Sequence, residues 1–129
     1  MASDYIKLPA VAAAGGDSVV ESTFSTSFPG SGSVTFNIRK IGKLVIMEVP
    51  EISGTADGGA FGSADALDAA LCPRTFIYAP CWINENGTDK LVVAEVDASG
   101  SIKFINTNAA NLAAGACFVN SFTMTWTLA

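Results

Sequence analysis

The segment ACFVNSFTMTWTLA, residues 116–129, decides the fold class of this chain. From Phe118 to Leu128 every second residue is large and apolar except Asn120, and the residues between them are Val, Ser or Thr. A period of two places side chains alternately on the two faces of a strand, and aromatic and β-branched residues favour strands. The segment therefore predicts one long closing strand with an aromatic face that includes Phe122 and Trp126.

Segments of the same character precede it and alternate with turn residues. Strands are predicted at 18–28, 33–49, 74–83, 90–97 and 101–105. Gly42 divides the second segment into a hairpin, and Pro80 marks 74–83 as an edge or bulged strand. About seven short strands separated by Gly, Asn and Pro turns predict an all-β fold, an antiparallel β-sandwich or jelly roll.

One domain is expected from 129 residues. We expect residues 1–18 to form an Ala- and Gly-rich lead-in and residues 19–129 to form the sandwich. The region 54–71 departs from the β pattern, and its second half predicts a short helix that Ser63 caps. Pro and Asn-Gly turns are expected at 29–32 and 84–89.

The composition limits the classes of partner. The net charge is −5 and the 7 basic residues are scattered, which argues against nucleic acid and against anionic membranes. No apolar run reaches the length of a membrane span, and the first residues do not predict a signal peptide. Hydrophobic residues make up 50% of the chain and charged residues 15%. Either the many Ala residues explain this, or the surface is buried against other copies of the chain; we favour the second explanation.

The chain contains no histidine, which removes Ser-His-Asp triads, Cys-His dyads and ordinary zinc sites. Its three cysteines, Cys72, Cys81 and Cys117, form no CxxC pair. Cys72 and Cys81 could form a disulfide, but we favour small buried free thiols. We predict that the protein is not an enzyme, that it has no catalytic or metal-binding residues and that it needs no cofactor.

Two groups of acids are candidate chemical sites. Asp65 and Asp68 could act as an acid/base pair, but an acidic first helical turn explains them as well. Glu85 and Asp89 could bind Ca²⁺ through oxygen ligands, although turns use the same residues and the spacing is not that of an EF-hand. We favour the structural interpretation for both groups.

A ligand site is expected in the loops 54–71, 84–89 and 106–115, because binding residues concentrate on loops. The candidate ligand-binding residues are Trp82, Asn84, Asn86 and Asp89. Trp82 could offer a platform for a sugar ring, although core packing is the simpler interpretation of this side chain.

Four elements occur in a fixed order: FNIRKIGKLVIMEVPEISG, LCPRTFIYAPCWI, LVVAEVDASGSIKFI and SFTMTWTL. Over residues 33–129 this arrangement resembles the C-terminal receptor-binding head domains of phage and other viral tail-fibre and baseplate proteins. The resemblance implies a homotrimeric β-sandwich on the virion. It also implies a host-surface glycan or protein as ligand and other virion proteins as partners.

Two other classes share this outline. A structural capsid-decoration or assembly protein would be trimeric on a virion and would have no receptor. A TNF/C1q-like jelly roll would be a trimeric ligand-binding module with its last strand in the centre of a sheet.

Overall fold

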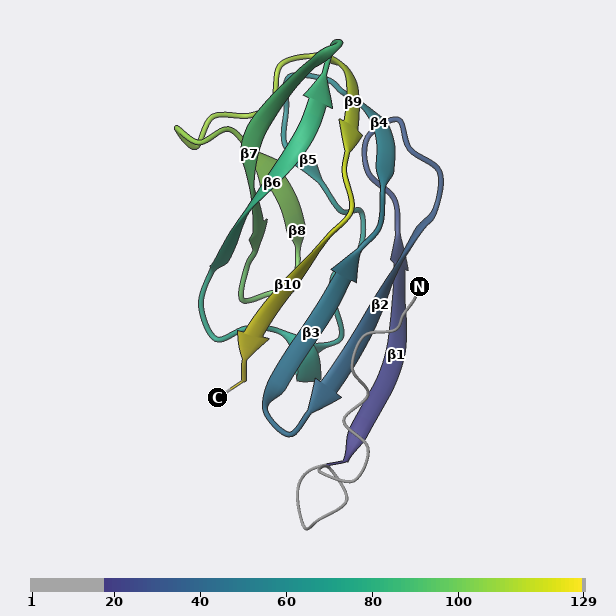
Figure 1. The fold of residues 1–129 in the computed structure, drawn as a ribbon, viewed down its shortest axis with the longest axis vertical. Helices are drawn as coiled ribbons and strands as arrows, with labels where there is room; N and C mark the ends of the chain where they lie inside the picture. The colour runs from purple at the N-terminus through teal and green to yellow at the C-terminus, as the bar shows by residue number, and fades with distance from the viewer. Residues whose placement is uncertain (1–17, 129) are drawn as a thin grey trace.

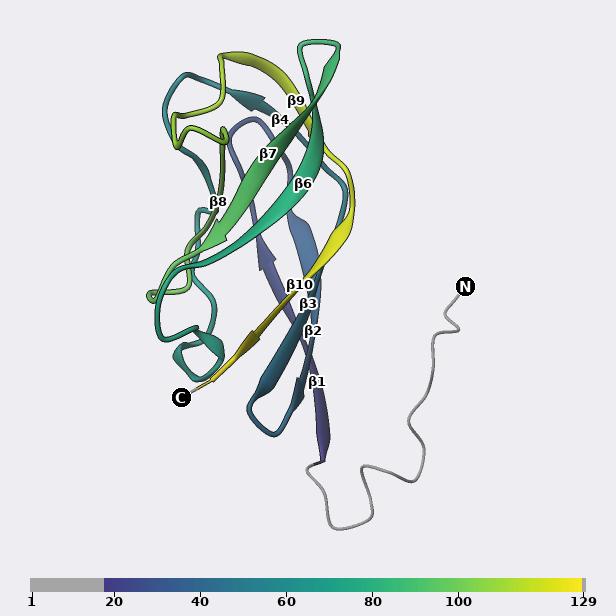
Figure 2. The same ribbon diagram turned by 60° about the vertical axis from the view of Figure 1, so that its left-hand side comes forward.

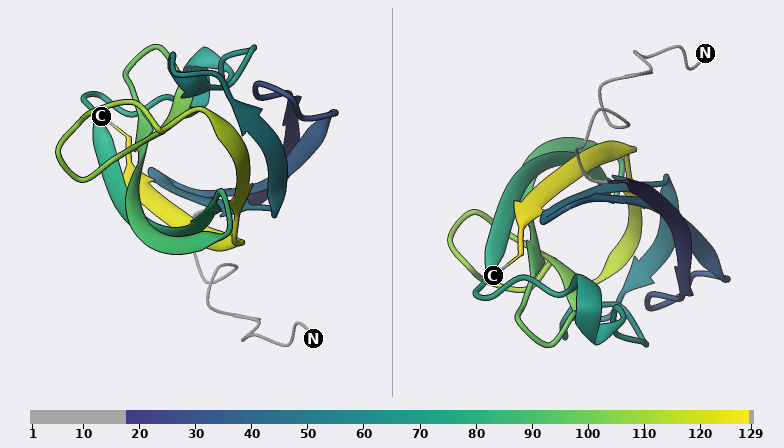
Figure 3. Two further views of the ribbon diagram at one scale, coloured as in Figure 1. Left: turned by 90° about the horizontal axis from the view of Figure 1, so that it is seen from above. Right: turned by 90° about the horizontal axis from the view of Figure 1, so that it is seen from below.

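The computed structural model describes residues 18–128 and shows two antiparallel β-sheets that face each other across one core (Figure 1). One sheet has four strands in the order β1-β2-β3-β10, and the other has six in the order β4-β9-β6-β7-β8-β5. Viewed along the long axis, the strands surround the core as a nearly closed ring (Figure 3). The predicted all-β antiparallel sandwich is confirmed.

The elements follow one another in this order: β1 (Val19–Thr26), β2 (Val34–Ile41), β3 (Leu44–Val49), β4 (Ile52–Ala56), β5 (Phe61–Gly62), the 3-10 turn η1 (Ala69–Leu71), β6 (Ile77–Glu85), β7 (Thr88–Val96), β8 (Ile102–Ile105), β9 (Gly115–Val119) and β10 (Phe122–Thr127). The predicted lead-in lies outside the described residues except for Ser18. No helix long and apolar enough to cross a membrane occurs between residues 18 and 128.

The closing segment forms two strands, so the prediction of one long strand is wrong. β9 lies in the six-stranded sheet and β10 in the four-stranded sheet (Figure 2). Cys117 and Val119 are buried in β9, whereas Met124 and Trp126 are buried in β10. The buried positions change from odd to even because the chain crosses between the sheets at residues 120–121, where pairing is interrupted. The alternating pattern hides this crossing, since Phe118 and Phe122 are both half-buried.

Among residues 18–128, β10 pairs only with β3 and is therefore an edge strand. The central last strand that a TNF/C1q-like jelly roll requires is absent from this part of the chain. β4 was not predicted as a separate strand; it begins directly after Pro50 and Glu51 and pairs with β9.

The strand that carries Pro80 is flanked by β9 and β7, so it is not an edge strand in the sheet order. However, β9 pairs with β6 only at Ile83–Glu85. In the described part of the chain, the residues of β6 around Pro80 pair with β7 alone, which suits a residue without a backbone N–H. The edge-strand prediction is therefore wrong for β6 as a whole and right for the half that contains proline.

The predicted helix at 63–71 is replaced by a loop that ends in η1. Asp68, not Ser63, caps this turn and accepts a hydrogen bond from the Ala70 N–H at 2.9 Å. Ser63 instead bonds to the backbone of Ile102, with its N–H at 2.7 Å from the carbonyl and its Oγ at 3.0 Å from the N–H. These tertiary hydrogen bonds override the weak local helix preference.

The predicted turn at 84–89 is shorter than expected, because β6 and β7 pair as far as Glu85 and Thr88. Asn86 and Gly87 alone form the turn, with φ of 52° and 90°. Two consecutive positive φ values are typical of a type I′ hairpin, which is why Asn-Gly is found here.

The core contains a cluster of aromatic side chains. The rings of Phe28, Phe36, Phe61 and Phe104 have neighbouring centroids 5.5–6.2 Å apart. Trp126 also lies in the core, with 4% of its area exposed, and its Nε1–H donates to the Leu71 carbonyl at 2.9 Å. This bond ties the loop of η1 to β10.

We expect Trp126→Phe to lower the free energy of unfolding by about 1–3 kcal/mol, since it removes the bond to Leu71 and leaves a gap in the core. Trp82→Phe is the matched control at an exposed tryptophan and should change the stability by less than about 0.5 kcal/mol. Urea denaturation measures both. Equal losses in the two variants would contradict the role given to Trp126.

Asp97 organises the turn between β7 and β8. Its Oδ1 accepts hydrogen bonds from Ser99 N at 2.9 Å, Ser99 Oγ at 2.6 Å and Ser101 N at 3.0 Å. Partial burial opposes ionisation of Asp97, but the hydrogen bonds outweigh it and hold the pKa below the ordinary value of 3.8.

Because the folded pKa of Asp97 is depressed, the carboxylate contributes stability above the ordinary pKa. That contribution is lost as the pH falls through the folded pKa. Asp97→Asn should therefore reduce the urea midpoint at pH 7 and reduce it less at pH 2–3. Asp57→Asn, in an exposed turn with a single hydrogen bond to Gly59, is the control. A loss in Asp97→Asn that is the same at both pH values would overturn this account.

Candidate functional site

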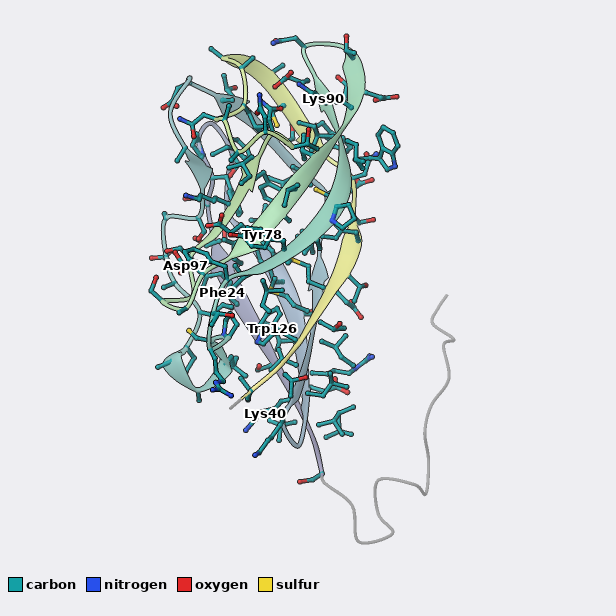
Figure 4. The ribbon with its side chains drawn as sticks, turned by 90° about the vertical axis from the view of Figure 1, so that its left-hand side faces the viewer. Phe24, Lys40, Tyr78, Lys90, Asp97 and Trp126 are labelled. Carbon is teal, nitrogen blue, oxygen red and sulfur yellow. The ribbon has the colours of Figure 1, made fainter. Side chains whose placement is uncertain are left out.

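Large exposed apolar side chains gather on the outer face of the six-stranded sheet. Phe76, Tyr78 and Trp82 have exposed fractions of 53%, 58% and 55%, and Leu91 of 44%. Together with Pro80 and the half-buried Phe118, we call these residues the aromatic face. Tyr78 lies about midway along the molecule, between the end with Lys90 and the end with Lys40 (Figure 4).

The alternation of β6 builds the aromatic face. Cys81 and Ile83 point into the core, so Tyr78, Pro80 and Trp82 point outward. The ring of Phe76, just before the strand, stacks on Tyr78 with centroids 6.1 Å apart and planes at 16°.

The neighbouring strands extend this surface sideways. Leu91 of β7 lies directly opposite Trp82, and Phe118 of β9 lies opposite Asn84. Cross-strand neighbours on one face are close enough for their side chains to touch.

A pair of interacting polar side chains lies at each end of the aromatic face. At one end the Asn84 Nδ2 donates to Asp89 Oδ1 at 3.0 Å, and the Asn84 Oδ1 accepts from Gly87 N at 2.9 Å. One Asn84 N–H and the second Asp89 oxygen remain available for a ligand. At the other end, Lys103 lies 3.8 Å from Glu95, which is opposite Tyr78.

Three of the four predicted ligand-binding residues therefore lie together: Trp82, Asn84 and Asp89. Asn86 does not join them, because its Nδ2 donates to the Ala114 carbonyl at 3.1 Å and its side chain fills the space beside Gly115. Asn86 has a structural role in holding the 106–115 loop to the hairpin. The preference for core packing of Trp82 is wrong, since more than half of its area is exposed.

Sequence reasoning missed Phe76, Tyr78, Leu91 and Phe118. The alternation in FIYAPCWIN would have placed Tyr78 on the same face as Trp82. Leu91 requires the register of the β6–β7 hairpin, and Phe118 requires the pairing of β9 with β6, which no local pattern contains.

The acids considered as chemical sites have structural partners. Asp65 accepts a hydrogen bond from Thr26 Oγ1 at 3.1 Å, and Asp68 caps η1. Glu85 binds Lys90 Nζ at 3.2 Å and accepts from Ala113 N at 3.0 Å. No three His, Cys, Asp or Glu side chains between residues 18 and 128 are grouped as a metal site would need.

The three cysteines are free thiols, as predicted. Burial, with a smaller effect of Cys117, raises the pKa of Cys81 to about 12. Burial and the Glu85 carboxylate raise the pKa of Cys117 to about 11. Burial, followed by Asp97 and Asp68, also raises the pKa of the half-buried Cys72. The thiolate is the nucleophile, so none of the three is activated near neutral pH.

The fold is similar to that of a reovirus attachment protein, sigma1, whose structure was solved in complex with α-2,3-sialyllactose. The TM-score is 0.52 with 11% sequence identity, over 88% of this chain and 67% of that chain. At this identity the similarity concerns the fold. No family model matches the sequence, and no curated protein sequence matches it either.

Proposed function

We propose that this chain is a virion-associated attachment domain that binds a host-surface glycan or protein without catalysing a reaction. The observation that carries the proposal is the aromatic face, on which Trp82 is exposed beside the Asn84–Asp89 pair. Large exposed apolar patches with a polar border mark interaction sites. The sequence resemblance to receptor-binding heads and the fold shared with an attachment protein support the same role.

The geometry suits a ligand that is apolar on one side and polar at its edge. The indole of Trp82 would cover the apolar face of a sugar ring or a side chain of a protein receptor. The free N–H of Asn84 and the free oxygen of Asp89 would then bind a hydroxyl or amide at the edge of the ligand. Aromatic anchors of this kind contribute most of the binding energy in protein interfaces as well.

A non-catalytic role is part of the proposal. It rests on the absence of histidine from the sequence and on the structural partners of Asp65, Asp68 and Glu85.

We expect Trp82→Ala to abolish binding of the glycan or host receptor that stacks on the aromatic face, because the stacking surface is lost. Binding is measured on arrays of bacterial and eukaryotic surface glycans and on whole cells. Leu44→Ala, at an apolar side chain that is 40% exposed on the other sheet, is the control and should bind normally. Wild-type affinity in Trp82→Ala would remove the aromatic face as the ligand site.

A structural decoration or assembly protein is the second candidate, and the apolar half of the same face favours it. Phe76, Tyr78 and Pro80 are uncharged. The aromatic rings of Phe76 and Tyr78 are exposed on the outer face of the six-stranded sheet. A standard interface covers about 800 Å² on each partner around an apolar centre, and these rings could form such a centre between copies in a homotrimer.

Sedimentation of the full chain tests assembly directly. A trimer at micromolar concentration should dissociate when Phe76 and Tyr78 are both replaced by Ser, because the apolar centre is lost. Val20→Ser, at a residue 56% exposed on the other sheet, is the control. A wild-type monomer would end the homotrimer hypothesis. Virions that lose the protein and still attach to cells would favour decoration over attachment.

A further inference from the structure

A polar groove lies on the outer face of the four-stranded sheet. It consists of two adjoining hollows of about 380 and 290 Å³ that share Asn37 and Glu48. The first hollow is also lined by Glu21, Thr23, Arg39 and Ile46. The second continues past Thr123 of β10. Small-molecule sites are concave and typically hold about 300–1,000 Å³.

Strand register brings these side chains together. Asn37 of β2 lies between Thr23 of β1 and Glu48 of β3, and Thr123 of β10 lies beyond Glu48. The next outward row begins with Glu21 and Arg39 and continues to Ile46. Polar and charged side chains from four strands thus form a continuous row across the sheet.

The groove offers hydrogen-bonding groups that have no partner among the residues the structure describes. Within residues 18–128, the Asn37 amide and the Glu48 carboxylate have no hydrogen-bond or ion-pair partner. Arg39 Nε lies 3.7 Å from Glu21 Oε2. An amide and a carboxylate provide donors and acceptors side by side, which is what hydroxyl groups need because each hydroxyl both donates and accepts.

The charge of the groove and its one apolar side chain limit the class of ligand that it could bind. Two carboxylates, Glu21 and Glu48, face one guanidinium, Arg39, in a chain whose net charge is −5. An anionic ligand would meet like charges, which disfavours it. The side chain of Ile46 adds an apolar contact for the C–H side of a ring.

We propose that the polar groove binds a neutral oligosaccharide, at a second site on the four-stranded sheet that is separate from the aromatic face of the six-stranded sheet. The proposal does not depend on the function of the aromatic face. It rests on the paired hollows, the unused groups of Asn37 and Glu48 and the excess of carboxylates.

The test is calorimetric titration of the full chain with neutral probes, the oligomers of glucose, galactose and N-acetylglucosamine. The anionic probe is α-2,3-sialyllactose. At least one series of neutral oligomers should bind. Asn37→Ala combined with Glu48→Gln should lower its affinity at least about tenfold, because hydrogen bonds to a charged group are lost. Thr127→Ala, on the same face but outside the groove, is the control. An unchanged melting temperature in the double variant excludes misfolding as the cause.

Trp82→Ala separates the two sites. Neutral oligosaccharide binding that survives this substitution but not the groove substitutions supports the proposal. Tighter binding of sialyllactose, loss of all saccharide binding in Trp82→Ala, or no binding of any neutral probe would overturn it. A change in the sedimentation coefficient of the groove variant would also overturn the proposal. Such a change would show that the groove forms contacts between copies of the chain.

Discussion

The structure depends on the crossing of the chain between its two sheets at residues 120–121. β9 completes the interior of one sheet and β10 closes the edge of the other, so the single segment 115–127 joins both inner faces to one core. Side chains from the two sheets can exclude water only if they face each other, and this crossing holds them there. The hydrogen bond of Trp126 to Leu71 then ties the irregular loop before β6 to the same strand.

Because the core takes one set of alternating side chains, the other set is left to the outer faces, and the two outer faces differ in chemistry. The six-stranded sheet presents Tyr78 and Trp82, with a polar border at Asn84 and Asp89. The four-stranded sheet presents a groove around Asn37 and Glu48. A flat aromatic surface suits a stacked ring or an apolar partner, whereas a polar groove suits hydroxyl groups. The two faces therefore suit different ligands, and the binding surfaces lie largely on strands, although loops were expected to carry them.

A minority of the residues of the candidate site could be selected from sequence. Trp82, Asn84 and Asp89 were selected because they surround a turn, and the hairpin register does place them on one face. Asn86 was selected for the same reason, yet its positive φ and its bond to Ala114 give it a backbone role. The amino-acid types near a turn do not show which residues form the turn and which residues are exposed beside it for a ligand. Phe118 joins the face through pairing with Asn84 on a strand distant in sequence, which local patterns do not encode.

The sequence alone determined the all-β class, the Gly42 and Asn86-Gly87 reversals, the free thiols and the lack of any histidine chemistry. These follow from side-chain period, positive φ and residue type, which act over a few neighbouring positions. Only the tertiary structure decided that the closing segment is two strands, that residues 63–71 do not form the predicted helix, and which side chains share an outer face. Those outcomes depend on hydrogen bonds and strand pairs between residues far apart in the chain, such as Ser63 with Ile102 and Asn84 with Phe118. The free energy of such pairs is set by the assembled sheets and not by the local sequence.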